Sequence, residues 1–399
     1  MRRLFVWRRD PAMVVKSLDA VENLLRRGAV YDRLGVHPII NANGTQTTLG
    51  GSIMEPEAAQ AMAEASRTMV VIEELNERAG EIIAEHTGAE AGLVTAGAAA
   101  GLLLQATAVI AGDDPEKMAL LPDSTDMRNQ IVVKRTHNND FTRSWRQGGA
   151  KLVWVGNEET CLDWEIESAI GGETAALGFI ASRWHPDSFD GLHMMAEIAH
   201  GHGLPLIVDA AAMLPPAENL QRFIAHGADL VAYSGGKAIK GPQSSGVLCG
   251  RADLVHAAAV NNSPNHAIGR PMKVAREEIV GLITALDLYV QRDHEADMRR
   301  WFRECQVIVD AIVDIPGVTA SIEQDDWVRP VPEVSVVFTD GWHGSLATGV
   351  ASTLASGSPP IMIEASRRDG EDLFVNPHGL LSDEAELVAD RLRAALDVR

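Results

Sequence analysis

Short apolar runs alternate with helical patterns through the middle of this chain, and this alternation constrains the fold most. Runs typical of buried strands are IVVKR (131–135), KLVWV (151–155), ALGFIAS (176–182), PLIVDAA (205–211), DLVAYS (229–234) and GVLCG (246–250). Between them lie segments such as GLHMMAEIAHGHG (191–203), with apolar residues at helical spacing and glycines at the end. The alternation predicts an α/β fold with a mostly parallel sheet between helices.

The pattern changes from about Val274 to long amphipathic helices, and then to short strands, VSVVF (334–338) and DLFVNP (372–377), before a final helix over 382–397. This second half is typical of a small α+β domain. We therefore expect an N-terminal helical segment over residues 1–40, a large α/β domain over 41–275, and bridging helices with a small C-terminal domain over 276–399.

Composition excludes several classes of function. The chain has 399 residues, of which 46% are hydrophobic, enough for substantial buried cores. Its formal charge of −20 disfavours nucleic acid and anionic membrane surfaces as partners. No long uncharged apolar run or signal-peptide pattern is present, so we expect a cytoplasmic protein without a membrane partner. Three widely separated cysteines indicate neither a disulfide framework nor a zinc site.

Ligands of open α/β sheets bind at the carboxyl ends of the strands, where three segments carry chemistry. Asp209 follows four apolar residues, a position where a carboxylate is costly unless a cation or donor meets it. Ser234 ends a strand and leads into Gly235, Gly236 and Lys237. In GLVTAGAAAGLLL (92–104), Gly97 opens a helix whose free N–H groups suit a phosphate.

These are the parts that a pyridoxal phosphate enzyme needs. A lysine amine forms the Schiff base, a carboxylate holds the pyridine nitrogen protonated, and backbone donors hold the phosphate. Asp209 and Lys237 are about one strand–helix–strand step apart, which places them at neighbouring strand ends. The glycines before Lys237 let the backbone pass close to a cofactor without a side chain in the way.

Several ordered motifs resemble one known family. SGGKAIKGPQ (234–243) is similar to the lysine motif of the selenocysteine synthase-like group of fold type I pyridoxal phosphate enzymes, which holds a tRNA-dependent selenium transferase and an amino-sugar-acid ammonia-lyase. IINANGTQTTLGGS (39–52), LVTAGAAAGLLL, ASRWHPDSF (181–189) and GHGLPLIVDAAAML (201–214) resemble further segments of that group. The resemblance implies a fold type I transferase-like architecture, with a sheet of the seven-stranded type and a smaller C-terminal α+β domain.

The resemblance also implies roles for individual residues. Lys237 is the Schiff-base lysine, Asp209 pairs with the pyridine nitrogen, and Ala211 and His137 pack on the two faces of the ring, His137 also counting as catalytic. The phosphate falls to Gly97, Ala98 and Ser234. Substrate or anion contacts of lesser support are Thr45, Arg183, His185, Arg270 and Lys273, the last two toward a neighbouring subunit's cofactor in a homo-oligomer built on dimers. Apart from the resemblance, the need of a substrate carboxylate for a cationic partner makes Arg367 and Arg368 candidates to bind it.

The chain departs from the selenium transferase in two respects. The transferase has Asp where Gly236 stands, and it uses an additional N-terminal domain and a basic surface to hold tRNA, whereas this chain is acidic. We therefore expect a small amino acid or amino-sugar acid as substrate, with α,β-elimination after Lys237 takes the α-proton. The alternatives are a transferase or racemase that uses the same residues, and a tRNA-binding or scaffold relative without catalysis.

Competing interpretations of these motifs have less support. Lys240 lacks the Ser-Gly-Gly approach and fits a solvated or anion-contacting lysine. A Walker A loop is excluded because Ala238 stands where Ser or Thr is required. A dinucleotide-binding site has little support because no G-x-G-x-x-G follows a strand. The histidines of 193–202 have no acidic partner at ligand-like spacing, so we expect no metal.

Overall fold

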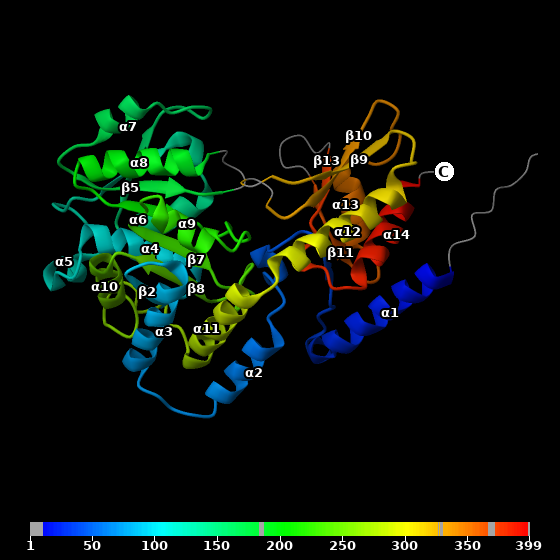
Figure 1. Ribbon diagram of the computed structural model, residues 1–399, viewed down its shortest axis with the longest axis horizontal. Coiled ribbons are helices and arrows are strands. Elements are labelled where there is room, and N and C mark those ends of the chain that lie inside the picture. The colour runs from blue at the N-terminus through cyan, green and yellow to red at the C-terminus, as the bar shows by residue number, and fades with distance from the viewer. Residues whose placement is uncertain (1–10, 183–186, 326, 328–329, 366–371, 398–399) are drawn as a thin grey trace, which may run out of the picture. The chain divides into compact units, whose positions relative to one another are not determined.

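A computed structural model describes residues 11–182, 187–325, 327, 330–365 and 372–397, and Figure 1 shows their arrangement into helices and strands. The chain divides into two compact units. The large unit holds residues 50–292 and 326–328, and the small unit holds residues 1–49, 293–325 and 329–399. No helix among the described residues is both long enough and apolar enough to cross a bilayer.

The large unit alternates strands and helices, as the sequence pattern predicts. Its elements are α2 (Pro56–Ala65), α3 (Ile72–Thr87), β2 (Ala91–Thr95), α4 (Gly97–Ile110), α5 (Pro115–Leu120), β3 (Gln130–Lys134), η3 (Arg135–His137), η4 (Asp140–Thr142), α6 (Arg143–Gln147), β4 (Lys151–Val155), α7 (Asp163–Ala169), β5 (Thr174–Ile180), α8 (Phe189–Gly201), β6 (Leu206–Asp209), α9 (Asn219–Ala225), β7 (Leu230–Ser234), β8 (Gly246–Gly250), α10 (Ala252–Asn261) and α11 (Arg276–Gln291).

Seven strands form the sheet of the large unit, in the order β2-β8-β7-β6-β5-β3-β4. β8 runs antiparallel to both of its neighbours, and the other neighbouring strands are parallel. Every residue of β5 and β8 is buried, as expected of strands covered on both faces. The expected fold type I sheet, mostly parallel and seven-stranded, is therefore confirmed.

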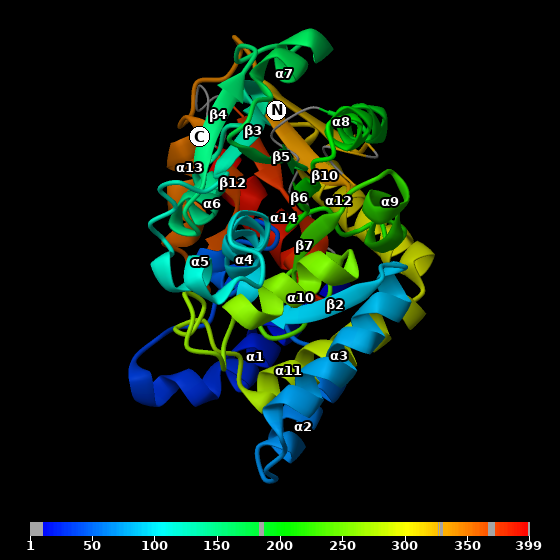
Figure 2. The ribbon, with the colours of Figure 1, turned by 90° about the vertical axis from the view of Figure 1, so that its left-hand side faces the viewer.

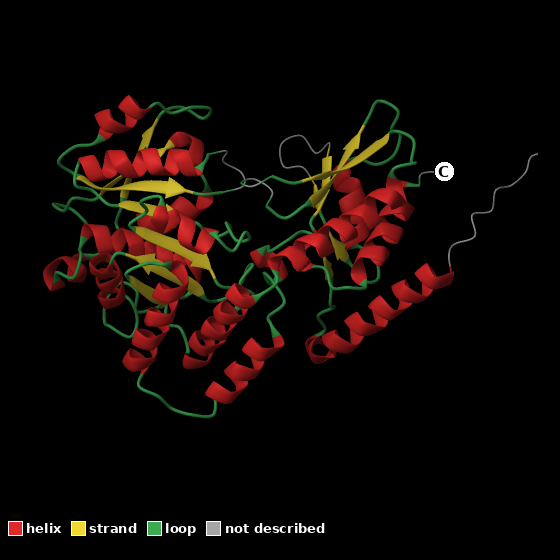
Figure 3. Ribbon diagram, viewed as in Figure 1, coloured by secondary structure: helices red, strands yellow, loops and turns green. Residues whose placement is uncertain are grey.

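Two apolar cores lie on opposite faces of this sheet, and Figure 3 shows helices on both of its sides. Side chains of successive strand residues point to opposite faces, so Val132 belongs to one core and Val133 to the other. Helices α4, α6 and α10 cover the face of Val133, and Figure 2 shows α4 and α10 side by side. Helices α3, α8, α9 and α11 cover the opposite face.

A buried glutamine fastens α4 to the centre of the sheet. The Gln105 side-chain amide donates to the carbonyls of Val208 (2.9 Å) and Leu230 (3.0 Å), and its oxygen accepts from the Trp145 indole N–H at 3.0 Å. One side chain thus satisfies three polar groups that water does not reach. Because α4 begins at the candidate phosphate site, this anchor also fixes the position of that site.

The small unit has its own core and its own sheet. Its elements are α1 (Pro11–Gly28), η1 (Ala29–Leu34), β1 (Ile40–Asn41), η2 (Thr47–Leu49), α12 (His294–Ile312), β9 (Val318–Glu323), β10 (Glu333–Phe338), α13 (Ala347–Ala355), β11 (Ile361–Met362), β12 (Glu364–Ala365), β13 (Asp372–Val375), η5 (Pro377–Gly379) and α14 (Glu384–Leu396). Four antiparallel strands follow the order β12-β13-β10-β9, and β1 pairs with β11 in parallel.

The observed units divide the chain at other places than the expected domains. The expected large domain ends near residue 275, but α11 buries Ile279, Leu282 and Leu286 in the core of the large unit, so the division follows Arg292. Residues 41–49 belong to the small unit, where β1 pairs with β11. Trp327 comes from the segment between β9 and β10, yet it belongs to the large unit, with its ring centroid 5.2 Å from that of Phe189.

Replacing Gln105 tests the anchor of α4. Gln105→Leu keeps a side chain of similar size but leaves the buried Trp145 indole without an acceptor, so we expect the free energy of unfolding to fall by about 2–3 kcal/mol. Denaturant unfolding of the purified variant measures this loss. Gln60→Leu, on the exposed side of α2, is the matched control and should change stability by less than about 0.5 kcal/mol. Equal stability of the two variants would contradict the anchoring role.

Candidate active site

One edge of the large sheet collects the ends of the strands that carry the candidate residues. Asp209 ends β6 and Ser234 ends β7, and these strands are parallel neighbours. β8 runs the other way, so its first residue, Gly246, lies at the same edge, paired with Ser234 on one side and with Thr95 of β2 on the other. Sheet topology thus brings together segments that are far apart in the sequence.

The start of α4 lies at this edge and leaves backbone donors free. The residue before the helix provides no side-chain cap, and Gly97 has a φ of +81°, a conformation that favours glycine. A Cβ placed on Gly97 would have no heavy atom within 4 Å, so space is open there. A Cβ on Gly246 would come within 2.6 Å of the Gly97 carbonyl carbon and 2.8 Å of the Ala98 nitrogen, which shows how closely β8 supports the turn.

Ser234 adds a hydroxyl beside that turn. Its side chain is half-buried and makes no hydrogen bond with any residue that the structure describes. A free hydroxyl next to free helix N–H groups is a donor set suited to a phosphate. Gly97, Ala98 and Ser234 therefore lie together as the sequence predicts, although their contact with a phosphate stays a prediction.

Asp209 is a buried carboxylate with little local compensation. The side chain is 5% exposed, and Oδ1 accepts a hydrogen bond from the Ala211 N–H at 3.0 Å. Burial raises the pKa of Asp209, although the Ala211 N–H and the charge of Lys237 oppose the rise. A carboxylate in this position calls for a cationic partner, and the protonated nitrogen of a pyridine ring is one.

Lys237 lies in the turn that follows β7. Burial lowers the pKa of its amine, and the charge of Asp209 opposes this effect. The turn is held by backbone hydrogen bonds from the Gly235 N–H to the Ser245 carbonyl (2.9 Å) and from the Gly241 N–H to the Gly235 carbonyl (2.8 Å). The chain thus presents a half-buried amine, more easily deprotonated than usual, in a well-supported loop.

The two glycines before Lys237 have a different role from the expected one. A Cβ on Gly235 would lie 2.3 Å from Ser245 Oγ and 2.6 Å from Leu282 Cδ1, and a Cβ on Gly236 would lie 2.4 Å from the Gln243 Cα. Glycine is therefore required by the packing of the turn against the chain itself. The space beside their Cα atoms is filled by other residues of the chain and not left open for a cofactor.

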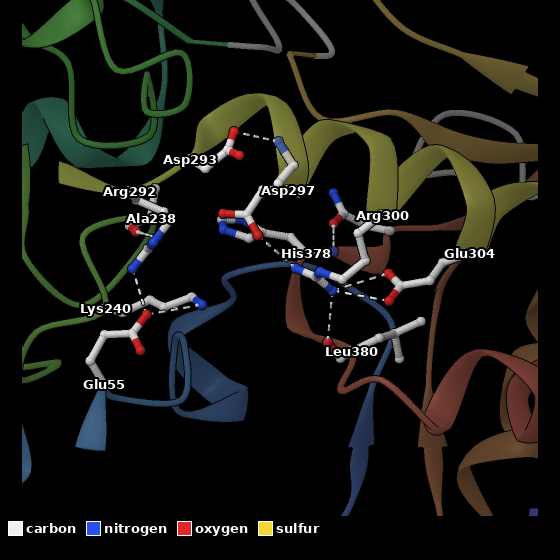
Figure 4. Close-up of polar contacts among 12 residues, drawn as sticks. Glu55, Ala238, Lys240, Arg292, Asp293, Asp297, Arg300, Glu304, His378 and Leu380 are labelled. Carbon is white, nitrogen blue, oxygen red and sulfur yellow. Dashed lines mark hydrogen bonds and ion pairs between the residues drawn. The ribbon is translucent and has the colours of Figure 1, made fainter. Parts of the chain in front are cut away.

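Lys240, the second lysine of the motif, is a structural residue. Its ammonium lies 3.2 Å from Glu55 Oε1, and Arg292 binds the same oxygen, as Figure 4 shows. Arg292 also donates to the Ala238 carbonyl at 3.5 Å. These contacts agree with the expectation that Lys240 contacts an anion. Lys237 is the lysine whose amine pKa the charge of Asp209 raises, in opposition to burial, which lowers it.

His137 is fully buried and takes part in a cluster that the sequence analysis missed. Its Nε2 lies 2.9 Å from Asp187 Oδ2, and the Lys134 ammonium lies 2.9 Å from the same oxygen. Lys134 closes β3 as Asp209 closes β6, so inspection of every strand end would have found it. Asp187 precedes Ser188, which caps α8, and gave no comparable signal.

The charges of this cluster shift two pKa values. Burial lowers the pKa of His137; its hydrogen bond with Asp187 opposes this shift, and the Lys134 charge adds to it. Burial raises the pKa of Asp187, but hydrogen bonds and charges from His137 and Lys134 outweigh burial and bring this pKa to about 2. Near neutral pH Asp187 is therefore a carboxylate and His137 a neutral imidazole.

Two of the remaining candidates lie in a loop of the large unit, one lies in the small unit, and four lie outside the described residues. Arg270 and Lys273 are exposed in the loop between α10 and α11, without an ion pair to any described residue. Thr45 is half-buried in the small unit, after β1. Four other candidates lie outside the described residues, namely Arg183, His185, Arg367 and Arg368.

Other polar clusters have structural partners. In the small unit Arg300 binds Glu304 (3.0 Å), Asp297 (3.3 Å) and the Leu380 carbonyl (3.4 Å), as Figure 4 shows, so this arginine is already engaged. His200 pairs with Asp229 at 2.8 Å. Among the described residues no group of three or more His, Cys, Asp or Glu side chains could hold a metal ion.

Comparison with known proteins identifies relatives along most of the chain. Residues 143–302 match the model of the L-seryl-tRNA selenium transferase family. The chain is 35% identical to D-glucosaminate-6-phosphate ammonia lyase of Salmonella typhimurium, over 91% of this chain and 97% of that protein. It is 34% identical to a 5'-C-glycyluridine monooxygenase-decarboxylase of a Streptomyces species, over 92% of each chain.

A solved structure shows the same fold. The structure of a D-glucosaminate-6-phosphate ammonia-lyase superposes with a TM-score of 0.79 at 34% identity, covering 92% of this chain and 98% of that one. The buried Asp209, the amine of Lys237 and the free donors at the start of α4 supply the groups that pyridoxal phosphate requires. The chain therefore belongs to the selenocysteine synthase-like family of fold type I pyridoxal phosphate-dependent enzymes.

Proposed function

We propose that this protein is a pyridoxal phosphate-dependent lyase that carries out α,β-elimination on a small amino acid or amino-sugar acid. The observation that supports it most is a buried carboxylate, Asp209, at the end of one strand that interacts electrostatically with the half-buried Lys237, in the turn after the neighbouring strand. The relative that is 35% identical over nearly the whole chain is an ammonia lyase of an amino-sugar acid phosphate.

The proposal gives a role to each candidate residue at the carboxyl ends of the strands. When bound, pyridoxal phosphate supplies an electron sink for the electrons left at the substrate Cα. Asp209 holds the proton on the pyridine nitrogen, and Gly97, Ala98 and Ser234 bind the phosphate. Lys237 attaches the cofactor and then takes the Cα proton, a task for which a lowered amine pKa is favourable.

Ala211 and His137 are proposed to pack on the two faces of the ring. The hydrogen bonds of His137 suit packing better than proton transfer, because Nδ1 accepts from the Ile180 N–H at 3.3 Å and Nε2 contacts Asp187. Lys237 then remains the acid/base residue at the substrate Cα. The proposal thus keeps His137 at the ring and assigns the proton chemistry to one amine.

The negative charge of the chain supports a small substrate over tRNA. A formal charge of −20 repels a polyanion, and the family relatives at 35% and 34% identity carry names of small-molecule enzymes. Arg270 and Lys273 are exposed and available for an anion, in keeping with contact to a neighbouring subunit's cofactor. A homo-oligomer built on dimers and a cytoplasmic location stay predictions.

Lys237→Ala tests the attachment of the cofactor. Wild-type protein incubated with pyridoxal phosphate should become yellow, with an absorbance band that borohydride abolishes, and Lys237→Ala should lose both the band and the activity. Lys240→Gln is the matched control, because Lys240 pairs with Glu55, and it should keep the band. A colourless wild-type protein, or a variant at position 237 that is still yellow, would contradict the proposed function.

Asp209→Asn tests the carboxylate. The amide keeps the shape of the side chain but cannot hold the proton on the pyridine nitrogen, so we expect cofactor to bind while kcat falls roughly 100-fold or more. Steady-state kinetics and the absorbance spectrum of the variant measure the two effects. A kcat close to that of wild type would exclude the proposed role of Asp209.

A substrate panel tests the reaction type. Free and phosphorylated amino-sugar acids, hydroxy amino acids and thiol amino acids should be assayed for keto acid and ammonia, with and without oxygen. Elimination predicts keto acid and ammonia in equal amounts, independent of oxygen. Oxygen uptake with carbon dioxide release would instead favour the chemistry named for the Streptomyces relative.

A further inference from the structure

We propose that Asp187 is a positioning residue of the candidate active site, because it bridges Lys134 and His137 and so fixes the imidazole as the tautomer with hydrogen on Nε2. The kinetic consequence rests on the proposed function. The tautomer of His137 follows from contacts within the chain and does not depend on the proposed function. Neither residue was given a role from the sequence, although Asp187 lies in the segment ASRWHPDSF (181–189) and Lys134 in the strand run IVVKR (131–135).

The tautomer follows from the partners of the two ring nitrogens. The Ile180 N–H donates to His137 Nδ1 at 3.3 Å, a long hydrogen bond that favours a lone pair on Nδ1 but does not by itself fix the tautomer. The other nitrogen, Nε2, then carries the hydrogen and donates it to Asp187 Oδ2 at 2.9 Å. A carboxylate on one side and a backbone donor on the other thus define one neutral form of the ring.

Asp187 is itself held from several directions. Its Oδ1 accepts from the Ser188 N–H at 2.8 Å, and its Oδ2 accepts from the Lys134 ammonium at 2.9 Å. A Cβ on Gly191 would lie 2.0 Å from Oδ1, so the carboxylate occupies the space where any larger residue would place its side chain. The first turn of α8 therefore leaves room for this carboxylate and fixes its place.

Lys134 keeps the carboxylate charged in a site with little water. The side chains of Lys134 and Asp187 are 8% and 12% exposed, and at this burial a carboxylate without its cation would be strongly destabilised. The Lys134 ammonium also lies 5.7 Å from the centre of the Phe179 ring. The same ring meets His137 edge-on, with 4.7 Å between centroids, so it packs against both ends of the bridge.

The cluster is linked to the carboxylate proposed to hold the pyridine ring. Ile180, whose N–H binds His137, is the register partner of Asp209 in the neighbouring strand. The next N–H, that of Ala181, donates to the Asp209 carbonyl at 2.8 Å. If the imidazole of His137 moved, its distance from Asp209 would change. In the proposed function this distance matters, because His137 packs on the pyridine ring and Asp209 holds the ring nitrogen.

Two substitutions test the bridge in different ways. Asp187→Asn offers a single acceptor oxygen, so either Ser188 or the pair of Lys134 and His137 faces an amide donor. Gly191→Ala leaves every polar group of the cluster in place but displaces the carboxylate. Asp190→Asn is the matched control, because Asp190 is an exposed acid in the first turn of α8, three residues after Asp187.

The direct readout is the pair of ring-nitrogen chemical shifts of His137 in protein labelled with ¹⁵N-histidine and free of cofactor, assigned by their loss in His137→Gln. Wild type and Asp190→Asn should show a protonated Nε2 and an unprotonated Nδ1. Asp187→Asn and Gly191→Ala should lose this pattern, and with cofactor their kcat should fall by up to about 100-fold with a smaller change in KM.

The outcomes separate the inference from the proposed function. Wild-type shifts and wild-type kcat in Gly191→Ala and Asp187→Asn would overturn the positioning role. Should Asp187→Asn fail to fold, as judged by circular dichroism, Gly191→Ala alone decides the question. A changed tautomer in a protein that never acquires the yellow band would support the bridge and refute the proposed function.

Discussion

The buried carboxylate of Asp209 is the constraint on which the rest of the site depends. It stands at the end of a fully buried strand, where its ionised form is stable only beside positive charge or donors. The Ala211 N–H and the charge of Lys237 supply part of that compensation. A protonated pyridine nitrogen would supply the rest. The unfavourable burial of the Asp209 charge therefore favours binding of a ligand that has such a cation.

Much of the architecture could be predicted because its signals are local. The continuous apolar run GVLCG coincides with β8, since a strand covered on both faces has no polar alternation, and KLVWV coincides with β4, although that edge strand is only partly buried. The residues that end such runs, Asp209 and Ser234, lie at the sheet edge as expected. Parallel topology makes this outcome general, because it gathers the carboxyl ends of the strands.

Other features depend on contacts between distant segments and could not be predicted. Gly235 and Gly236 seemed to make room for a cofactor, but Ser245 and Gln243 from the returning chain occupy that space. Asp187 becomes meaningful only when β3 and β5 are paired, because its partner Lys134 lies 53 positions away. The division after Arg292 likewise follows from the packing of α11 on the core of the large unit, which helical periodicity alone does not reveal.

Burial acts on both basic side chains, Lys237 and His137, but their hydrogen bonds differ. Burial lowers the pKa of both Lys237 and His137, but only His137 has both nitrogens in hydrogen bonds that fix its neutral form. Lys237 keeps an amine that is not tied to a fixed partner among the described residues, so it can bind a carbonyl carbon or accept a proton. In the proposed function, one amine that can move carries the proton transfer at the substrate Cα, and the hydrogen bonds of both His137 nitrogens keep that imidazole from competing for the proton.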